Sequence, residues 1–231
     1  LMHGHWNPFG GAQVDGDFGR DCPMDRFAIE DGAEPLAPST GLYVHTAAKE
    51  EPAYYAVVTQ IDGVQNSVAF SAENAAQAPV AEKPAPQQPV LQRELPQQPF
   101  WNYREKRLQY VQFVGPPLTN LPCAYFNWSV AVPDEHGAAL PVELSLPREE
   151  RSYWRTQYRL YPDSLILTPH DFPRVTYAYG YHESLGTLRS FKEGCVQPYT
   201  ERRTLAFLEW VKTKWPVDAQ QVVVTAVRRI S

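Results

Sequence analysis

The stretch TERRTLAFLEWVKTKWPVDAQQVVVT, residues 200–225, decides the fold class. Its first part, Thr200–Trp215, has the apolar spacing of a helix, and Pro216–Ala219 has the composition of a turn. Gln221–Thr225 is a short apolar run typical of a buried strand. A helix that leads through a turn into such a strand predicts an α/β sheet.

Two features of residues 200–215 support the helix. Apolar residues recur three and four positions apart, which predicts one buried stripe made of Leu205, Leu208, Val211 and Trp215. The end residues also suit a helix, because Thr200 can act as the N-cap and Glu201 complements the positive end. Lys212 and Lys214 complement the negative end, and Pro216 ends the helix.

Four β-prone segments come before this helix, and they set the expected sheet. They are Leu108–Val114, Tyr125–Val132, Pro141–Leu146 and Ser164–Thr168. Strands first, then an alternation of strand and helix, predict a sheet with an antiparallel start and a parallel centre. We expect the 221–225 strand to lie parallel in the centre of the sheet, with the 200–215 helix packed beside it.

A proline-rich stretch divides the chain. Residues 78–99 contain six prolines, which disfavour a helix or a central strand, so we expect an extended connector there. The expected organisation is a small antiparallel β domain over residues 1–77, the connector over 78–99, and an α/β domain over 100–231.

The first of these domains is predicted from short β-prone segments that alternate with turns. The segments are Arg26–Glu30, Gly41–Thr46 and Ala53–Gln60, and the turns include Asp31-Gly32 and Asp62-Gly63. Tyr54-Tyr55, followed by Asp62-Gly63 and Asn66, resembles the last hairpin of a fibronectin type III or related sandwich. This resemblance implies a β-sandwich-like module, of which residues 1–77 hold an incomplete copy.

Composition excludes some classes of function. The chain has 231 residues, is 43% hydrophobic and carries a net charge of −5, so we expect a folded protein without the basic footprint that nucleic acid needs. No apolar run is long enough to span a bilayer. Cys22, Cys123 and Cys195 lack a C-x-x-C pair, which leaves room for one disulfide but indicates no zinc site. His3 and His5 lack a third ligand, so no metal is expected.

A longer resemblance runs through the C-terminal part of the chain. The short motifs on which it rests, in chain order, are Tyr179-Gly180-Tyr181-His182-Glu183, Gly186-Thr187, Tyr199–Arg203, Trp210-Val211, Trp215–Asp218 and Val222–Thr225. This order resembles secreted bacterial α/β-hydrolases of the esterase and polyhydroxybutyrate depolymerase type. The resemblance implies a serine hydrolase that acts on carboxylic esters, is secreted or periplasmic, and needs no cofactor.

In that family a G-x-S-x-G turn follows the strand and presents the nucleophile. Here the first glycine falls at Ala226 and the serine at Arg228. Arginine stays protonated and cannot attack an acyl carbon, so no catalytic residue is assigned. Three explanations remain open: a fragment of a longer reading frame, which the non-Met start favours, an inactive homologue, or a chain unrelated to hydrolases. All three predict that this polypeptide alone has no esterase activity.

The oxyanion hole also departs from the family pattern. Pro141–Leu146 is the candidate for the third strand, after which a glycine-rich loop normally donates a backbone N–H. Pro147 follows instead, and proline has no N–H to donate.

Several residues are candidates for substrate contact. His170 and Asp171 follow a predicted strand, at the edge where α/β sheets bind ligands, although Asp171 also suits a structural turn. Tyr179, Tyr181 and His182 would line an acyl or polyester pocket, or pack under a loop. The rival interpretation is a non-enzymatic protein that binds a polysaccharide or polymer surface. Exposed aromatic side chains would favour it, whereas a buried tyrosine cluster would favour the hydrolase scaffold.

Overall fold

The computed structural model describes residues 27–37, 39–45, 47, 49–66, 70–84, 88–95, 104–119, 124–146, 159–169, 180–185 and 187–226. The chain divides into two compact units. One consists of Leu1–His45 with Pro86–Ser231, and the other of Thr46–Ala85.

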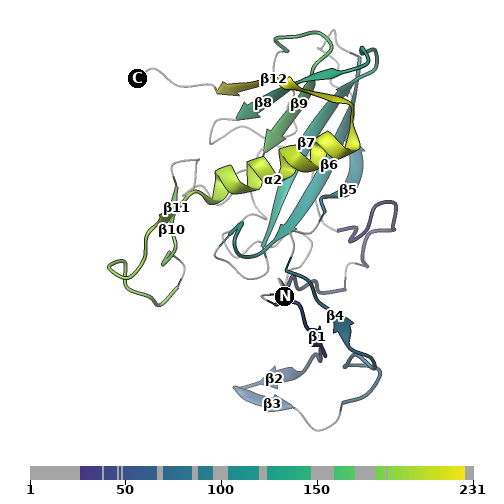
Figure 1. The fold of residues 1–231 in the computed structure, drawn as a ribbon. Helices are drawn as coiled ribbons and strands as arrows, with labels where there is room; N and C mark the ends of the chain where they lie inside the picture. Colours follow the sequence, from purple (N-terminus) through teal and green to yellow (C-terminus); the bar gives the residue numbers. More distant parts are fainter. Residues whose placement is uncertain are drawn as a thin grey trace. The chain divides into compact units, whose positions relative to one another are not determined.

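A six-stranded mixed sheet forms the body of the larger unit (Figure 1). In sheet order its strands are β12 (Val217–Ala226), β8 (Leu140–Leu146), β9 (Leu165–Pro169), β7 (Ala124–Pro133), β6 (Glu105–Val114) and β5 (Val90–Leu95). Strands β5, β6, β7 and β9 pair antiparallel in turn, whereas β9, β8 and β12 are parallel. The expected antiparallel start followed by a parallel part is therefore confirmed.

Strand β12 is parallel to β8, as expected, but its expected central position is wrong within the described residues. Its regular pairing runs from Val222 opposite Val142 to Ala226 opposite Leu146. No described strand pairs with its other side, so β12 is an edge strand here. The turn predicted at 216–219 is a short irregularity instead, held by the Asp218 carboxylate, which accepts from the backbone N–H of Gln220 at 2.9 Å.

Helix α2 (Tyr199–Lys214) packs across one face of the sheet (Figure 1). Its buried side is made by Tyr199, Thr200, Arg203, Phe207, Trp210 and Val211, so the predicted stripe is wrong in part. Leu205 is 60% exposed, while the Phe207 ring stacks on Trp128 of β7 with 3.9 Å between ring centroids. The large aromatic side chains fill the space over the sheet, which turns Leu205 towards solvent.

The start of helix α2 differs from the prediction. Pro198, not Thr200, occupies the N-cap position, and no side chain caps the helix there. Thr200 lies inside the first turn, where its hydroxyl accepts from the Arg203 guanidinium at 3.2 Å. At the other end the prediction is confirmed, because Trp215 is extended before Pro216 and the helix ends at Lys214.

Residues from the N-terminal part of the chain pack on the other face of the sheet, over β5, β6 and β7. Phe27 is buried against Val111, Phe113 and Tyr125, and its ring meets Tyr125 edge-on at 4.8 Å. The segments Arg26–Glu30 and Gly41–Thr46 form no strand within their described residues. The predicted sandwich-like domain is thus not confirmed, because residues 27–45 belong to the larger unit and pack on its sheet.

Part of the proline-rich stretch, which was expected to be an extended connector, forms a strand of the sheet. Its residues Val90–Leu95 form β5, the other edge strand of the sheet, a position compatible with nearby prolines. The N-terminal segment is hydrogen-bonded to this strand. The backbone N–H of Leu91 donates to Asp31 at 2.8 Å, and the Gln92 side chain exchanges two hydrogen bonds with the backbone of Ala28.

The smaller unit holds two short antiparallel pairs. Strand β1 (Pro52–Ala53) pairs with β4 (Val80–Ala81), and β2 (Thr59–Ile61) pairs with β3 (Val64–Asn66). The predicted turn at Asp62-Gly63 joins β2 to β3, and both residues have positive φ, 50° and 79°. Glycine and aspartate tolerate this conformation, so the hairpin prediction is confirmed.

Among the described residues no helix is both long and apolar enough to cross a membrane.

Candidate functional site at the carboxyl edge of the sheet

The carboxyl ends of the parallel strands meet at one edge of the sheet. Leu146 ends β8 and is paired with Ala226 at the end of β12, while Leu144 is paired with Leu167 near the end of β9. Ligands of α/β sheets bind at such an edge, and there the loops of several strands come together. This edge is therefore the candidate functional site.

Several of the predicted site residues lie outside the described residues, namely His170, Asp171, Tyr179 and Arg228. The strands that precede them are described. Residue 170 directly follows Pro169 of β9, and residue 228 lies two positions after Ala226 of β12. Both strands flank β8 and run parallel to it, so the carboxyl ends of β9 and β12 lie at the same edge of the sheet.

Tyr181 is described, and it is buried. It begins the short strand β10 (Tyr181–His182), which pairs antiparallel with β11 (Val196–Gln197), and only 3% of its surface is exposed. Its ring lies 6.1 Å from that of Tyr199 at the start of α2, and burial raises the pKa of both phenols. Tyr181 packs against the helix start and does not present a ring to solvent.

His182 is half-buried on the same hairpin. Its Nδ1 accepts a hydrogen bond from the backbone N–H of Ser184 at 3.2 Å, which leaves Nε2 to carry the proton of the neutral ring. The ring lies 4.8 Å from Phe191, which is itself exposed. His182 is thus held in one orientation near the surface.

A chain of polar contacts, which the sequence interpretation missed, ties the hairpin to the helix. Glu183 accepts from Gln197 at 3.0 Å, and this hydrogen bond is the main reason why the pKa of Glu183 is lowered. Gln197 in turn accepts from Arg202 at 2.8 Å. Cys195, a free exposed thiol, lies beside the Glu183 carboxylate at 3.7 Å. No spacing rule links these residues, so the sequence carries no signal for them.

Gly194 allows the hairpin to close, and its replacement should loosen the hairpin. A Cβ there would lie 2.7 Å from Ser184 Oγ, 2.8 Å from Glu183 Cγ and 2.8 Å from His182 Cε1. We expect Gly194→Ala to destabilise this region by about 1–3 kcal/mol, measured as faster amide hydrogen exchange over 180–197. Gly137→Ala is the matched control, because its Cβ would meet only Ala139 O at 3.9 Å. Equal exchange rates in both variants would contradict this prediction.

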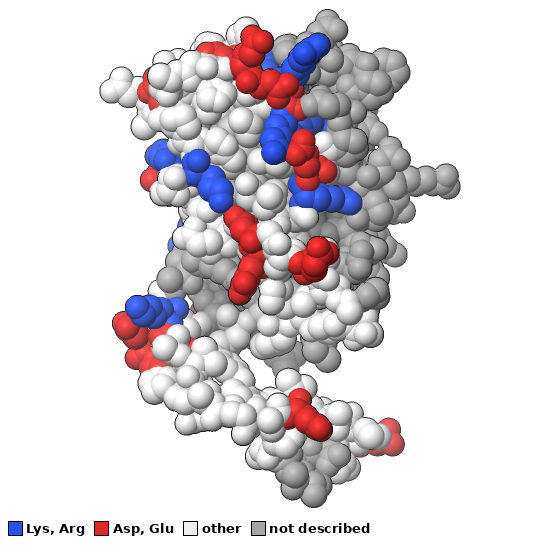
Figure 2. Space-filling view, turned by 90° about the vertical axis from the view of Figure 1, so that its right-hand side faces the viewer, with Lys and Arg blue, Asp and Glu red and all other residues white. Residues whose placement is uncertain are grey.

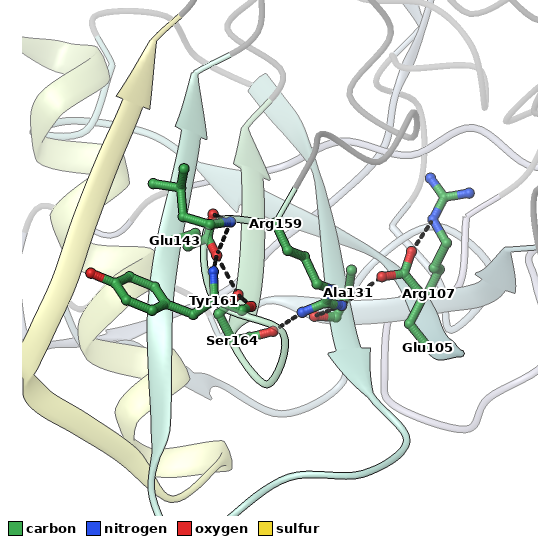
Figure 3. A network of polar contacts seen from close by, with 8 residues as sticks. Glu105, Arg107, Ala131, Glu143, Arg159, Tyr161 and Ser164 are labelled. Carbon is green, nitrogen blue, oxygen red and sulfur yellow. Dashed lines mark hydrogen bonds and ion pairs between the residues drawn. The ribbon is translucent and has the colours of Figure 1, made fainter. Parts of the chain in front are cut away.

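A second polar cluster, whose charged side chains are buried, lies away from this edge (Figure 3). Arg159 forms an ion pair with Glu105 at 2.5 Å and donates to the backbone carbonyl of Ser164. Glu143 accepts from the backbone N–H groups of Leu160 and Tyr161, each at 2.9 Å, and from the Ser164 hydroxyl at 2.5 Å. Since Glu105 begins β6 and Ser164 precedes β9, the cluster lies at the amino ends of these strands. Its role is to hold the 159–164 turn to the sheet.

Charges are mixed on the surface. In Figure 2, acidic and basic side chains are interspersed over the larger part of the face shown. Within the described residues no three His, Cys, Asp or Glu side chains gather in a way that could hold a metal ion.

Comparison with protein-family models, curated proteins and solved structures found no match. The geometry of the carboxyl edge therefore carries the functional argument.

Proposed function

We propose that this chain builds the first half of a serine-hydrolase domain that acts on carboxylic ester bonds, and that the chain lacks the catalytic serine. The observation that carries the proposal is the parallel pairing of β12 with β8, with Thr225 opposite Ser145 and Ala226 opposite Leu146. The hydrolase resemblance assigns β8 as the third strand and β12 as the strand that leads to the nucleophile.

The parallel pairing matters because of the way an oxyanion hole is built. One N–H donor follows the nucleophile and the other comes from the loop after the third strand, and both must reach the same oxygen. This requires the two strands to be neighbours, parallel, and to end together. β12 and β8 meet all three conditions, and helix α2 leads directly into β12.

The residues after β12 do not supply the nucleophile. Ala226 stands where the tight turn prefers glycine, and Arg228 stands at the serine position. A protonated guanidinium has no lone pair for attack on an acyl carbon, so this polypeptide alone does not hydrolyse esters by that route. On this proposal the intact hydrolase is a secreted or periplasmic enzyme that needs no cofactor.

The rival function, binding of a polysaccharide or polymer surface, draws support from the smaller unit. Tyr54 is 69% exposed and Phe70 is 64% exposed, as stacking on a sugar or polymer would need. The burial of Tyr181 points the other way for the larger unit. Adsorption of the purified chain to insoluble polymer separates the two functions, because the hydrolase scaffold does not require it.

The hydrolase proposal is tested by sequencing the gene past the codon for Thr225, in all three reading frames. We expect a Gly-x-Ser-x-Gly sequence directly after Val222–Thr225 in one frame. The protein joined in that frame should hydrolyse p-nitrophenyl esters and be labelled by a fluorophosphonate probe, whereas the present chain should do neither. Labelling of the present chain, or no such turn in any frame, would contradict the proposal.

A further inference from the structure

The loop that joins β10 to β11 repeats one short pattern. Residues 187–189, Thr-Leu-Arg, and residues 190–192, Ser-Phe-Lys, each place a hydroxyl first, an apolar side chain second and a basic side chain third. In both copies the hydroxyl of the first residue accepts from the backbone N–H of the third, at 3.1 Å for Thr187 and at 3.2 Å for Ser190. Hydrogen bonds of this kind fix a turn. The loop therefore presents one apolar and one basic side chain from each of two defined turns.

The two turns are also tied to the buried base of the hairpin. The Ser184 side chain is buried, and its hydroxyl donates to the backbone carbonyl of Ser190 at 3.1 Å. The backbone carbonyl of Ser184 accepts from the Thr187 hydroxyl at 2.7 Å. Tyr181, at the start of the hairpin, is buried against the start of α2. Because the loop is held in this way, it loses less conformational entropy on binding than a flexible loop would.

The apolar side chains of this hairpin point into solvent. Leu188 is fully exposed, Phe191 is 60% exposed and Val196 of β11 is 61% exposed. The Phe191 ring lies 4.8 Å from the His182 ring, and Val196 is the cross-strand partner of His182, so Phe191 and Val196 border the same histidine. Exposed apolar side chains that gather in one place mark an interaction site.

We propose that the 187–193 loop docks the chain on an anionic lipid surface, with Leu188 and Phe191 inserted among the headgroups and the two basic side chains beside lipid phosphates. The loop carries Arg189 and Lys192 against one acidic residue, Glu193, whereas the whole chain carries a net charge of −5. Charges further away than about 8–10 Å are largely screened at physiological ionic strength, so the local charge governs docking. Apolar side chains with basic neighbours suit the boundary between acyl chains and anionic headgroups.

The small size of the exposed loop favours a lipid surface over a protein partner. A specific protein interface takes about 800 Å² and roughly 20–30 residues from each partner. Residues 187–193 form a single short loop. A bilayer surface needs no matching shape, because it adapts to the side chains that enter it. Docking through this loop alone is weak and reversible, and it does not depend on ester hydrolysis.

Co-sedimentation of the purified chain with vesicles made of equal parts phosphatidylcholine and phosphatidylserine tests the proposal. We expect the chain to bind, and we expect the double substitution Leu188→Ser with Phe191→Ser to lower the partition coefficient about tenfold or more, because two apolar side chains no longer enter the bilayer. Leu205→Ser is the matched control, since Leu205 is an exposed leucine of α2, and it should leave the partition coefficient unchanged. No binding to these vesicles, or a double variant that binds as well as the control, would overturn the proposal.

A second variant tests the role of the charges. Arg189→Gln with Lys192→Gln should weaken binding to the mixed vesicles and leave the weaker binding to pure phosphatidylcholine unchanged, because that surface has no net charge. High salt should weaken binding of the unsubstituted chain more than binding of this variant. If the chain ignored vesicles but was retained on immobilised polyglutamate, and this variant was not, the loop would bind an acidic protein and the proposal would be wrong.

Discussion

Replacing Glu143 with alanine should lower the free energy of unfolding by about 3 kcal/mol, the largest effect we expect for a polar residue. The Glu143 carboxylate is 1% exposed and accepts from the backbone N–H groups of Leu160 and Tyr161 and from the Ser164 hydroxyl. Its removal takes the acceptor away from the two backbone N–H groups and leaves the Ser164 hydroxyl with the backbone carbonyl of Tyr161 as its acceptor. Urea unfolding followed by tryptophan fluorescence measures the change.

Two further variants separate the loss of the buried hydrogen-bond acceptor from the loss of a negative charge. Glu143→Gln keeps the shape and one oxygen of the side chain, so a smaller loss is expected than for alanine. Glu209→Ala removes a carboxylate that is paired with Lys212 at 2.6 Å on the surface, and it should cost well under 1 kcal/mol. Equal losses for Glu143→Ala and Glu209→Ala would show that the buried contacts do not stabilise the 159–164 turn.

The sequence could predict the strands that lie deep in the sheet, because β-branched and aromatic residues recur along them and turn-forming residues bound them. The segments predicted at 108–114, 125–132, 141–146 and 164–168 correspond to β6, β7, β8 and β9 within a few residues at each end. The helix was equally accessible, since Pro216 and the basic last turn fix its end. The local sequence pattern was sufficient to predict a strand where both faces of that strand are buried.

The N-terminal segments could not be predicted in the same way. Arg26–Glu30 has the composition of a strand. Phe27 and Ala28 are nevertheless buried against the sheet, and Ala28 is hydrogen-bonded to a side chain and not to a neighbouring strand. Their partners, Val111 and Gln92, lie more than sixty residues away. A segment that packs on a distant sheet face looks locally like a segment that pairs with a neighbour.

The location of the candidate site could be predicted from the sequence, but the contacts within it could not. The order of strands placed His170 and Asp171 at a sheet edge, and the hydrolase resemblance added the positions that follow the 141–146 and 221–225 strands. The contacts of Glu183 with Gln197, and of Gln197 with Arg202, depend on the fold of a tight hairpin that Gly194 permits. Spacing in the sequence does not report such contacts, because they join residues through the geometry of the loop.

Phe207→Ala should be the most destabilising single change in the core, lowering the free energy of unfolding by about 3–5 kcal/mol. The Phe207 side chain is fully buried, stacks on Trp128 with 4° between the ring planes, and meets Trp210 at 5.1 Å. These partners are held by the sheet and the helix, so they cannot collapse into the cavity that alanine would leave. Thermal and urea unfolding monitored by circular dichroism measure the loss.

Leu205→Ala is the matched control, because it truncates an apolar residue of the same helix that is 60% exposed. We expect it to change the free energy of unfolding by less than about 0.5 kcal/mol. The pair decides which face of α2 meets the sheet, since the apolar spacing alone favours Leu205 and Leu208 while the packing favours Phe207 and Trp210. A larger loss for Leu205→Ala than for Phe207→Ala would mean that the helix is rotated. The rotation would remove the stack on Trp128, and with it the reason why the aromatic residues, and not the leucines, fix how α2 lies on the sheet.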